Sequence, residues 1–207
     1  MFNNLESLTD EHLLRRMSDG DEEAFTLLFR RRKAGIYRFA MHMSGSQSIA
    51  EDVTQEAFMA LIRDPQGYSS EKGTLVGYLY GIARNQVLRR LEKDRFVVLT
   101  ESGDDEDTVG INQAYEGDDP LEALTRNETV ERVRNAVLAL PAHYREVVVL
   151  CELQEMSYAD TAVALNCAVG TVRSRLHRAR AMLIEKLKAT HGADLPSTSA
   201  GTARCFA

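Results

Sequence analysis

The stretch YADTAVALNCAVGTVRSRLHRARAML, residues 158–183, has the clearest structural pattern in this chain. Its apolar residues recur at helical spacing, which predicts two short helices that share a core; they are Leu165, Val169, Val172 and Leu176. Asn166 stands between the two patterns, and asparagine accepts the left-handed backbone of a tight turn better than most residues. The sequence therefore predicts a helix-turn-helix, with small Ala162 allowing a close crossing.

A row of basic and polar side chains follows the predicted turn. It contains Thr171, Arg173, Ser174, Arg175, His177 and Arg178, with Arg180 beyond them. The second helix of a helix-turn-helix enters the major groove of DNA. Arginine pairs with two acceptors of guanine there, and flanking arginines contact phosphates. A basic, solvated face on an ordinary helical hairpin is the alternative, but four arginines within the eight residues 173–180 favour DNA binding.

The overall charge works against strong DNA binding by this chain alone. The 207 residues carry a formal net charge of −6, and residues 101–125 contain nine acidic side chains with no Lys or Arg. DNA affinity depends on neutralising phosphates, so an acidic segment in the same molecule weakens it. We therefore expect weak binding by the isolated protein and a requirement for a partner.

The helical periodicity predicts an all-α fold of two small domains. We place these domains at residues 10–95 and 128–189, joined by a flexible acidic linker at 96–127 and followed by a disordered tail at 190–207. In the first domain we expect a helix over 21–43, a second with Ser48 as its N-cap, and a third from Leu75 to near Arg95. The run 96–99 is strand-like in composition, but alone it cannot form a sheet.

The first domain carries two further polar surfaces. Asp52, Gln55 and Glu56 lie at positions i, i+3 and i+4 and form one face of the second helix, which could equally be a solvated surface. The third helix combines aromatic residues with Arg and Asn, as single-stranded nucleic-acid surfaces do; these residues are Tyr78, Tyr80, Arg84, Asn85, Arg89 and Arg90. The alternative is that the two tyrosines are half-buried helix residues.

Several classes of protein are disfavoured by the sequence. No run approaches the roughly 18 apolar residues of a membrane span, and the N-terminus lacks the pattern of a secretory signal, so we expect a cytoplasmic protein. Three scattered cysteines predict reduced thiols, with a metal site involving His143 or His177 as the less favoured alternative. Phosphate-loop, metalloprotease and nucleophile-elbow motifs are missing, so we expect no catalysis and no cofactor.

The three surfaces resemble, in order and spacing, the extracytoplasmic-function (ECF) sigma factors of bacterial RNA polymerase, in the sigma-70 family. AEDVTQEAFMALIR (50–63) is similar to the helix with which that family binds core polymerase. GTLVGYLYGIARNQVLRRLEKDR (73–95) is similar to its promoter-melting helix. LPAHYREVVVL (140–150) and MSYADTAVALNCAVGTVRSRLHRAR (156–180) are similar to its −35-binding domain.

The resemblance implies a role for each surface. Asp52, Gln55 and Glu56 would contact core polymerase, and Tyr78, Arg84, Asn85 and Arg89 would hold the melted −10 strand, with a base captured by the loop 67–74. The row that contains Thr171, Arg173, Ser174, Arg175, His177 and Arg178 would read the −35 duplex. It also implies an anti-sigma factor as a partner.

Three departures from the family pattern affect these roles. Tyr78 stands where the family usually has Trp and Leu75 where it has Phe, so the melting surface differs; Asn166 replaces a turn glycine. The acidic linker could mimic nucleic acid in a basic channel or serve only as a spacer. A conventional helix-turn-helix repressor remains the rival class, although it leaves the first domain without a function.

Overall fold

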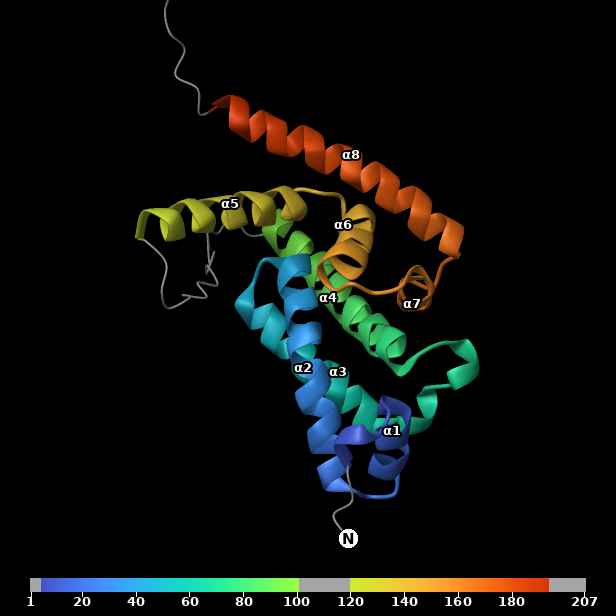
Figure 1. The fold of residues 1–207 in the computed structure, drawn as a ribbon. Helices are drawn as coiled ribbons and strands as arrows, with labels where there is room; N and C mark the ends of the chain where they lie inside the picture. Colours follow the sequence, from blue (N-terminus) through green and yellow to red (C-terminus); the bar gives the residue numbers. More distant parts are fainter. Residues whose placement is uncertain (1–4, 101–119, 194–207) are drawn as a thin grey trace, which may run out of the picture.

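The computed structural model describes residues 5–100 and 120–193, with side chains for 5–93 and 127–189. Every regular element in these ranges is helical, which confirms the all-α prediction (Figure 1). Of the predicted flexible linker at 96–127 and disordered tail at 190–207, residues 101–119 and 194–207 fall outside the described residues, whereas residues 190–193 are helical and belong to α8. The α-helices are α1 (Asp10–Ser18), α2 (Glu22–Ser44), α3 (Gln47–Arg63), α4 (Leu75–Thr100), α5 (Pro120–Leu138), α6 (Ala142–Val148), α7 (Tyr158–Ala164) and α8 (Val169–Ala193).

Helices α1 to α4 form the N-terminal unit around a shared apolar core. Their facing stripes bury Leu28, Phe39, Val53, Leu61 and Leu79 almost completely. The predicted spacing in the first three long helices is confirmed, because each buries one side at helical periodicity. The result is a compact four-helix support that holds α3 and α4 side by side.

The start of α3 differs from the expected capping pattern. Ser46, not Ser48, is the N-cap, with an extended backbone (φ −113°, ψ 126°) and a side-chain oxygen that accepts a hydrogen bond from the Ile49 amide at 3.4 Å. Ser48 lies inside the helix, so the prediction of a Ser48 cap was wrong. Two serines two residues apart offer equivalent caps, and only the extended backbone at Ser46 distinguishes them.

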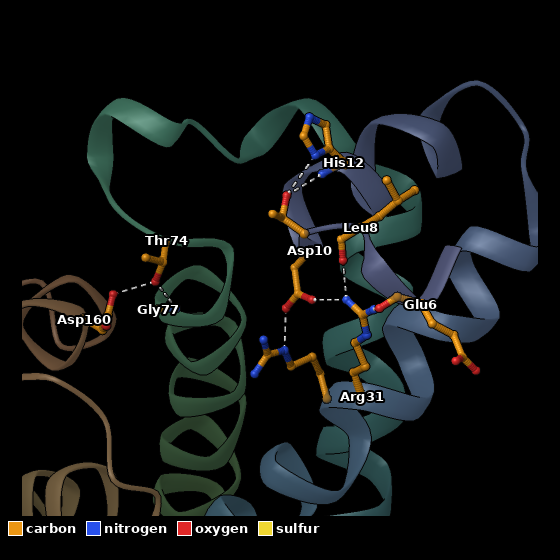
Figure 2. A network of polar contacts seen from close by, with 10 residues as sticks. Glu6, Leu8, Asp10, His12, Arg31, Thr74, Gly77 and Asp160 are labelled. Carbon is orange, nitrogen blue, oxygen red and sulfur yellow. Dashed lines mark hydrogen bonds and ion pairs between the residues drawn. The ribbon is translucent and has the colours of Figure 1, made fainter. Parts of the chain in front are cut away.

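A buried carboxylate ties the beginning of the chain to α2 (Figure 2). Asp10 is only 6% exposed and pairs with Arg31, at 3.2 Å, and with Arg32. Arg31 also donates to the backbone oxygens of Leu8, at 2.7 Å, and Glu6. A buried carboxylate is tolerated only when it is paired in this way, so Asp10 fixes α1 against α2.

Helical structure enters both ends of the predicted linker. Helix α4 continues to Thr100 through the run that was strand-like in composition, and α5 begins at Pro120, a residue suited to the first turn of a helix. The loop before α4 contains two short 3-10 helices, Pro65–Gly67 and Ser70–Lys72.

The C-terminal unit consists of α5, α6, a π-helical turn at Val149–Leu153, α7 and α8. Helix α8 runs across α6 and continues toward α5 (Figure 1). Leu140, Leu150, Val172 and Leu176 form the apolar centre, and each is at most 2% exposed. Helix α6 begins at Ala142, directly after Pro141, and is followed by the π-helical turn.

The predicted turn between α7 and α8 is confirmed. Asn166 has a φ of +48°, in the left-handed region, and its amide donates to the Val163 carbonyl at 3.1 Å. Ser157 caps α7 by accepting from the Asp160 amide at 3.0 Å. The sequence 158–183 therefore forms the helix-turn-helix that its apolar pattern indicated.

Replacing Asn166 tests whether the left-handed turn determines stability here. Asn166→Ala should lower the free energy of unfolding by about 1 kcal/mol, because the left-handed conformation is costly for alanine. Asn166→Gly should change it by only a few tenths of a kcal/mol, because glycine adopts that conformation readily. Urea denaturation followed by circular dichroism measures both. Equal losses in the two variants would show that the asparagine side chain, not the backbone conformation, matters.

Candidate nucleic-acid and protein interface

Helix α8 presents opposite faces to the core and to the surroundings. Val172, Leu176 and Ala179 are buried against the rest of the C-terminal unit. The predicted reading residues Arg173, Ser174, His177 and Arg178 are all exposed, while Thr171 and Arg175 are half-buried at the edges of this face. The structure thus brings the predicted row together on one exposed side of the second helix of the hairpin.

Two side chains outside that row hold arginines in place. The Arg173 guanidinium lies 5.9 Å from the ring centre of Tyr158, which is within the range of a cation–π contact. Arg180 donates through Nε to Glu152 at 3.2 Å, so the predicted phosphate contact already has an acidic partner. Sequence reasoning missed Tyr158 and Glu152, because both contacts cross a turn whose geometry the sequence does not specify.

The α4 residues predicted to bind a single strand divide into buried and exposed groups. Tyr80 is a core residue, 7% exposed, whose ring packs edge-on against Phe39. Tyr78 is half-buried beside Tyr68, with ring centres 5.9 Å apart, and burial raises the pKa of both hydroxyls. Asn85 is exposed. Half-burial of Tyr78 still leaves part of its ring accessible.

The two arginines of this group have different surroundings. Arg89 is exposed, whereas Arg84 donates through Nε to Glu146 of α6 at 2.9 Å. The Glu146 side chain is 2% exposed, and burial raises its pKa. The charge and the hydrogen bond of Arg84 lower that pKa and so partly offset the effect of burial. Arg84 is therefore engaged by the C-terminal unit in this structure. Its partner could not be predicted, because 62 residues separate the pair.

The polar face of α3 forms as predicted and carries an additional partner. Asp52, Gln55 and Glu56 are all exposed on one side of the helix. Arg90 of α4 reaches across to Glu56 at 2.8 Å and to Asp52 at 3.5 Å. Its hydrogen bond to Glu56 is the largest cause of a raised Arg90 pKa. The acidic face is therefore a three-residue ion-pair cluster rather than two separate carboxylates.

An apolar groove of about 820 Å³ adjoins this cluster between α2, α3 and α5. Phe29, Phe58 and Ile62 contribute to its lining, and Gln55 lies at its edge. Burial, together with Arg134 and Arg38, lowers the pKa of His42 in the same groove. The groove places exposed apolar surface directly beside the α3 polar face.

The two cysteines among the described residues, Cys151 and Cys167, are free thiols. Cys151 and Cys167 are half-buried, and burial raises the pKa of the Cys151 thiol. Within 5–93 and 127–189, no three His, Cys, Asp or Glu side chains gather as metal ligands would. None of the described helices is long and apolar enough to cross a membrane.

Comparison with known proteins identifies both units. Residues 28–97 match the family model for sigma-70 region 2, and residues 130–183 match that for sigma-70 region 4. The ECF RNA polymerase sigma-E factor of Haemophilus influenzae is 31% identical over 188 residues, which cover 88% of this chain and 97% of that protein. The chain belongs to the ECF sigma factors of the sigma-70 family. The resemblance seen in the sequence is thus confirmed, and with it a part in promoter-specific transcription initiation.

Two other comparisons extend the relationship. The ECF sigma factor SigE of Mycolicibacterium smegmatis is 32% identical over 160 residues, covering 77% of this chain and 60% of that protein. A solved structure of the sigma factor RpoE bound to the anti-sigma factor NepR, from Bartonella quintana, is 28% identical, with a TM-score of 0.61. It covers 75% of this chain and 91% of that one. This ECF sigma factor therefore shares the fold of its relatives across both units.

Proposed function

We propose that this ECF sigma factor binds core RNA polymerase through α3, melts the −10 element with α4 and reads the −35 element with α8. The observation that carries the proposal is the exposed row on α8, because four side chains with base-reading chemistry emerge from one face of a helix-turn-helix. The other two surfaces lie on adjacent helices of the N-terminal unit. We also propose a cytoplasmic location, because RNA polymerase and promoter DNA, the proposed partners, are found there.

The α8 row supports recognition of duplex DNA. Arg173 and Arg178 are exposed and long enough to reach guanine edges, while Ser174 and His177 lie between them. Tyr158 restricts Arg173 before DNA arrives, which reduces the conformational entropy lost on binding. Arg180 can exchange Glu152 for a phosphate, so it contributes affinity without base preference.

The α4 surface and the preceding loop support capture of melted DNA. The accessible part of Tyr78 can stack on a base, and exposed Asn85 can hydrogen-bond to a base edge. Arg89 provides charge for the backbone. Extruding a base costs a few kcal/mol, which stacking and edge hydrogen bonds offset. Melting then proceeds from the binding energy of single-stranded DNA, without nucleotide hydrolysis by this protein.

The α3 cluster supports binding of a basic surface on core polymerase. Asp52 and Glu56 pair with Arg90 in the structure, which supports the proposal that this face binds cationic groups. We also propose an anti-sigma factor as a regulatory partner, because the Bartonella relative was solved with one. Inhibition by the tail beyond Thr190 is the alternative form of regulation.

Charge reversal on α3 tests the polymerase contact. Asp52→Arg with Glu56→Arg should weaken binding to core polymerase by about two orders of magnitude, because like charges across an interface cost several kcal/mol. Competition binding against the wild-type protein measures the loss. Asp19→Arg with Glu185→Arg makes the same charge change at two other exposed positions and should bind normally. Normal competition by the α3 double variant would refute the assignment.

Substitutions on α8 test base reading. Arg173→Ala and Arg178→Ala should each cost on the order of 1–3 kcal/mol and relax base preference upstream, whereas Arg180→Ala should weaken all promoters alike and reduce the salt dependence. Tyr158→Phe should retain the selectivity that Tyr158→Leu partly loses, since only the ring contacts Arg173. The measurement is holoenzyme selection from a pool of randomised −35 elements. Unchanged selectivity in both arginine variants would mean that α8 does not read bases.

Substitutions on α4 test melting. Asn85→Ala and Tyr78→Ala should leave the closed complex nearly intact and reduce the open complex, because both residues are assigned to single-stranded DNA. Permanganate footprinting of thymines near the start site reports the open complex. A pre-melted bubble template should restore much of the activity, since the unstacking cost is then already met. Wild-type permanganate reactivity in both variants would show that these two side chains contribute to packing and do not hold the melted strand.

A further inference from the structure

A small pocket lies between α2, α4 and the end of the π-helical turn, and arginines line it. Its volume is about 190 Å³. Its polar lining consists of Arg31, Arg32 and Arg38 of α2, Tyr80 of α4, and Gln154, the residue that follows the turn. Among the described residues, no carboxylate lines it. We call it the arginine pocket, and the proposed function uses none of these five residues.

The arginine pocket contains an amide nitrogen that has no partner. The Tyr80 hydroxyl donates to Gln154 Oε1 at 3.1 Å, which fixes the oxygen side of that amide. Gln154 Nε2 is buried and has no hydrogen-bond partner in the described part of the chain. Gly35 leaves room for this arrangement, because a Cβ there would lie only 2.7 Å from Tyr80 Oη. Buried donors are nearly always paired in folded proteins, so this one indicates an acceptor that the chain itself does not supply.

Two of the arginines have guanidinium nitrogens available for a ligand. Arg38 is exposed and forms no ion pair with another described residue. Arg32 uses Nε for Asp10, and its terminal nitrogens form no hydrogen bond within the described residues. Burial raises the pKa of the Tyr80 hydroxyl, whereas the charges of Arg38 and Arg32 act to lower it. Both guanidinium groups therefore lie close enough to this hydroxyl to affect its ionisation.

The charges of the pocket favour an anion with two negative charges. Arg31, whose guanidinium binds Asp10 and two backbone oxygens, adds a third positive charge (Figure 2). The Asp10 carboxylate offsets one of the three, which leaves two. A phosphate monoester carries about −1.5 to −2 charge at pH 7, and guanidinium groups pair with its oxygens in two-point contacts. A carboxylate ligand would neutralise only one of the two remaining charges.

Acidic side chains line a neighbouring hollow instead. That hollow shares Arg32 and Gln154 with the arginine pocket, and its carboxylates are those of Asp10, Glu11, Glu155 and Asp160. Arg38 does not line it. Because acidic neighbours weaken the attraction between Arg32 and an anion, we expect Arg38 to make the strongest contact with a ligand.

We propose that the arginine pocket binds the phosphoryl group of a small soluble ligand. Arg38 and the terminal nitrogens of Arg32 pair with phosphate oxygens, and Gln154 Nε2 donates to another. A terminal phosphate fits a hollow of about 190 Å³, whereas the phosphodiester of a nucleic acid must continue on both sides. The arginines belong to the N-terminal unit and Gln154 to the C-terminal unit, so the bound ligand bridges the two units.

A titration of the full chain with inorganic phosphate tests the site. Phosphorus NMR follows binding at constant ionic strength in potassium chloride, so that screening of the surface charges does not change. We expect saturable binding by the wild-type protein. Gln154→Glu should weaken it by at least about tenfold, because the new carboxylate still accepts the Tyr80 hydrogen bond but repels phosphate. Arg38→Ala should weaken it about tenfold, which corresponds to about 1.4 kcal/mol.

Two control variants match these changes outside the pocket. Gln66→Glu makes the same charge change at an exposed glutamine, and Arg30→Ala removes an exposed arginine from the same helix. Both should bind phosphate as the wild-type protein does. Absence of saturable binding by the wild-type protein, or equal losses in the pocket variants and the control variants, overturns the proposal.

Thermal unfolding gives a second readout that does not depend on NMR. Phosphate should raise the melting temperature of the wild-type protein, because a ligand that binds only the folded state stabilises it. It should not raise that of Gln154→Glu. Without phosphate this variant should be at least as stable as the wild-type protein, since the arginines pair with its new carboxylate. Equal stabilisation of both proteins by phosphate contradicts the site.

A single-stranded oligothymidylate with hydroxyl ends distinguishes the source of the phosphate. It supplies phosphodiesters only, so it should not displace inorganic phosphate from the pocket in the same titration. Displacement by the oligonucleotide would assign the pocket to the nucleic-acid backbone and overturn the binding of a small ligand.

Discussion

Where Gly77 lies, α4 and α7 approach so closely that an added Cβ would lie 3.2 Å from the Asp160 backbone oxygen, tighter than ordinary van der Waals contact. This steric constraint governs the relation between the two halves of the molecule. It brings the Thr74 hydroxyl within reach of Asp160, Tyr80 within reach of Gln154, and Arg84 within reach of Glu146. A methyl group at the crossing would require α7 to shift by a few tenths of an ångström, which would lengthen the contact nearest to it, between Thr74 and Asp160.

Different faces of helix α4 therefore contact different parts of the molecule. One face packs Leu79, Ala83 and Val87 into the N-terminal core, and another sends Arg90 to the acidic residues of α3. The face with Gly77 receives α7, and the exposed remainder carries Asn85 and Arg89. Few positions along the helix are unconstrained. This division explains its weak amphipathic pattern, since apolar, small and charged residues alternate around the whole circumference.

The sequence predicted the elements better than it predicted the partners of their side chains. Apolar spacing located the helix-turn-helix, and Asn166 marked its turn, because these signals are local. The cap of α3 was misplaced by two residues, since Ser46 and Ser48 offer the same chemistry. Tyr158, Glu152 and Glu146 were missed as partners of arginines, because their contacts depend on how helices far apart in sequence meet. The glycines of α4 could have indicated a close packing face, but not which helix fills it.

The pairing of Arg90 with Asp52 and Glu56 has a consequence for how a partner can bind there. A basic surface arriving at α3 meets carboxylates that are already neutralised in part, so association exchanges one ion pair for another. Binding by such an exchange gains less electrostatic free energy than binding to an unpaired acidic patch would. It is also selective for geometry, because an incoming cation must fit the two carboxylates better than Arg90 does. The released guanidinium, on the helix that is assigned to DNA, would then add positive charge beside the promoter once the partner is in place.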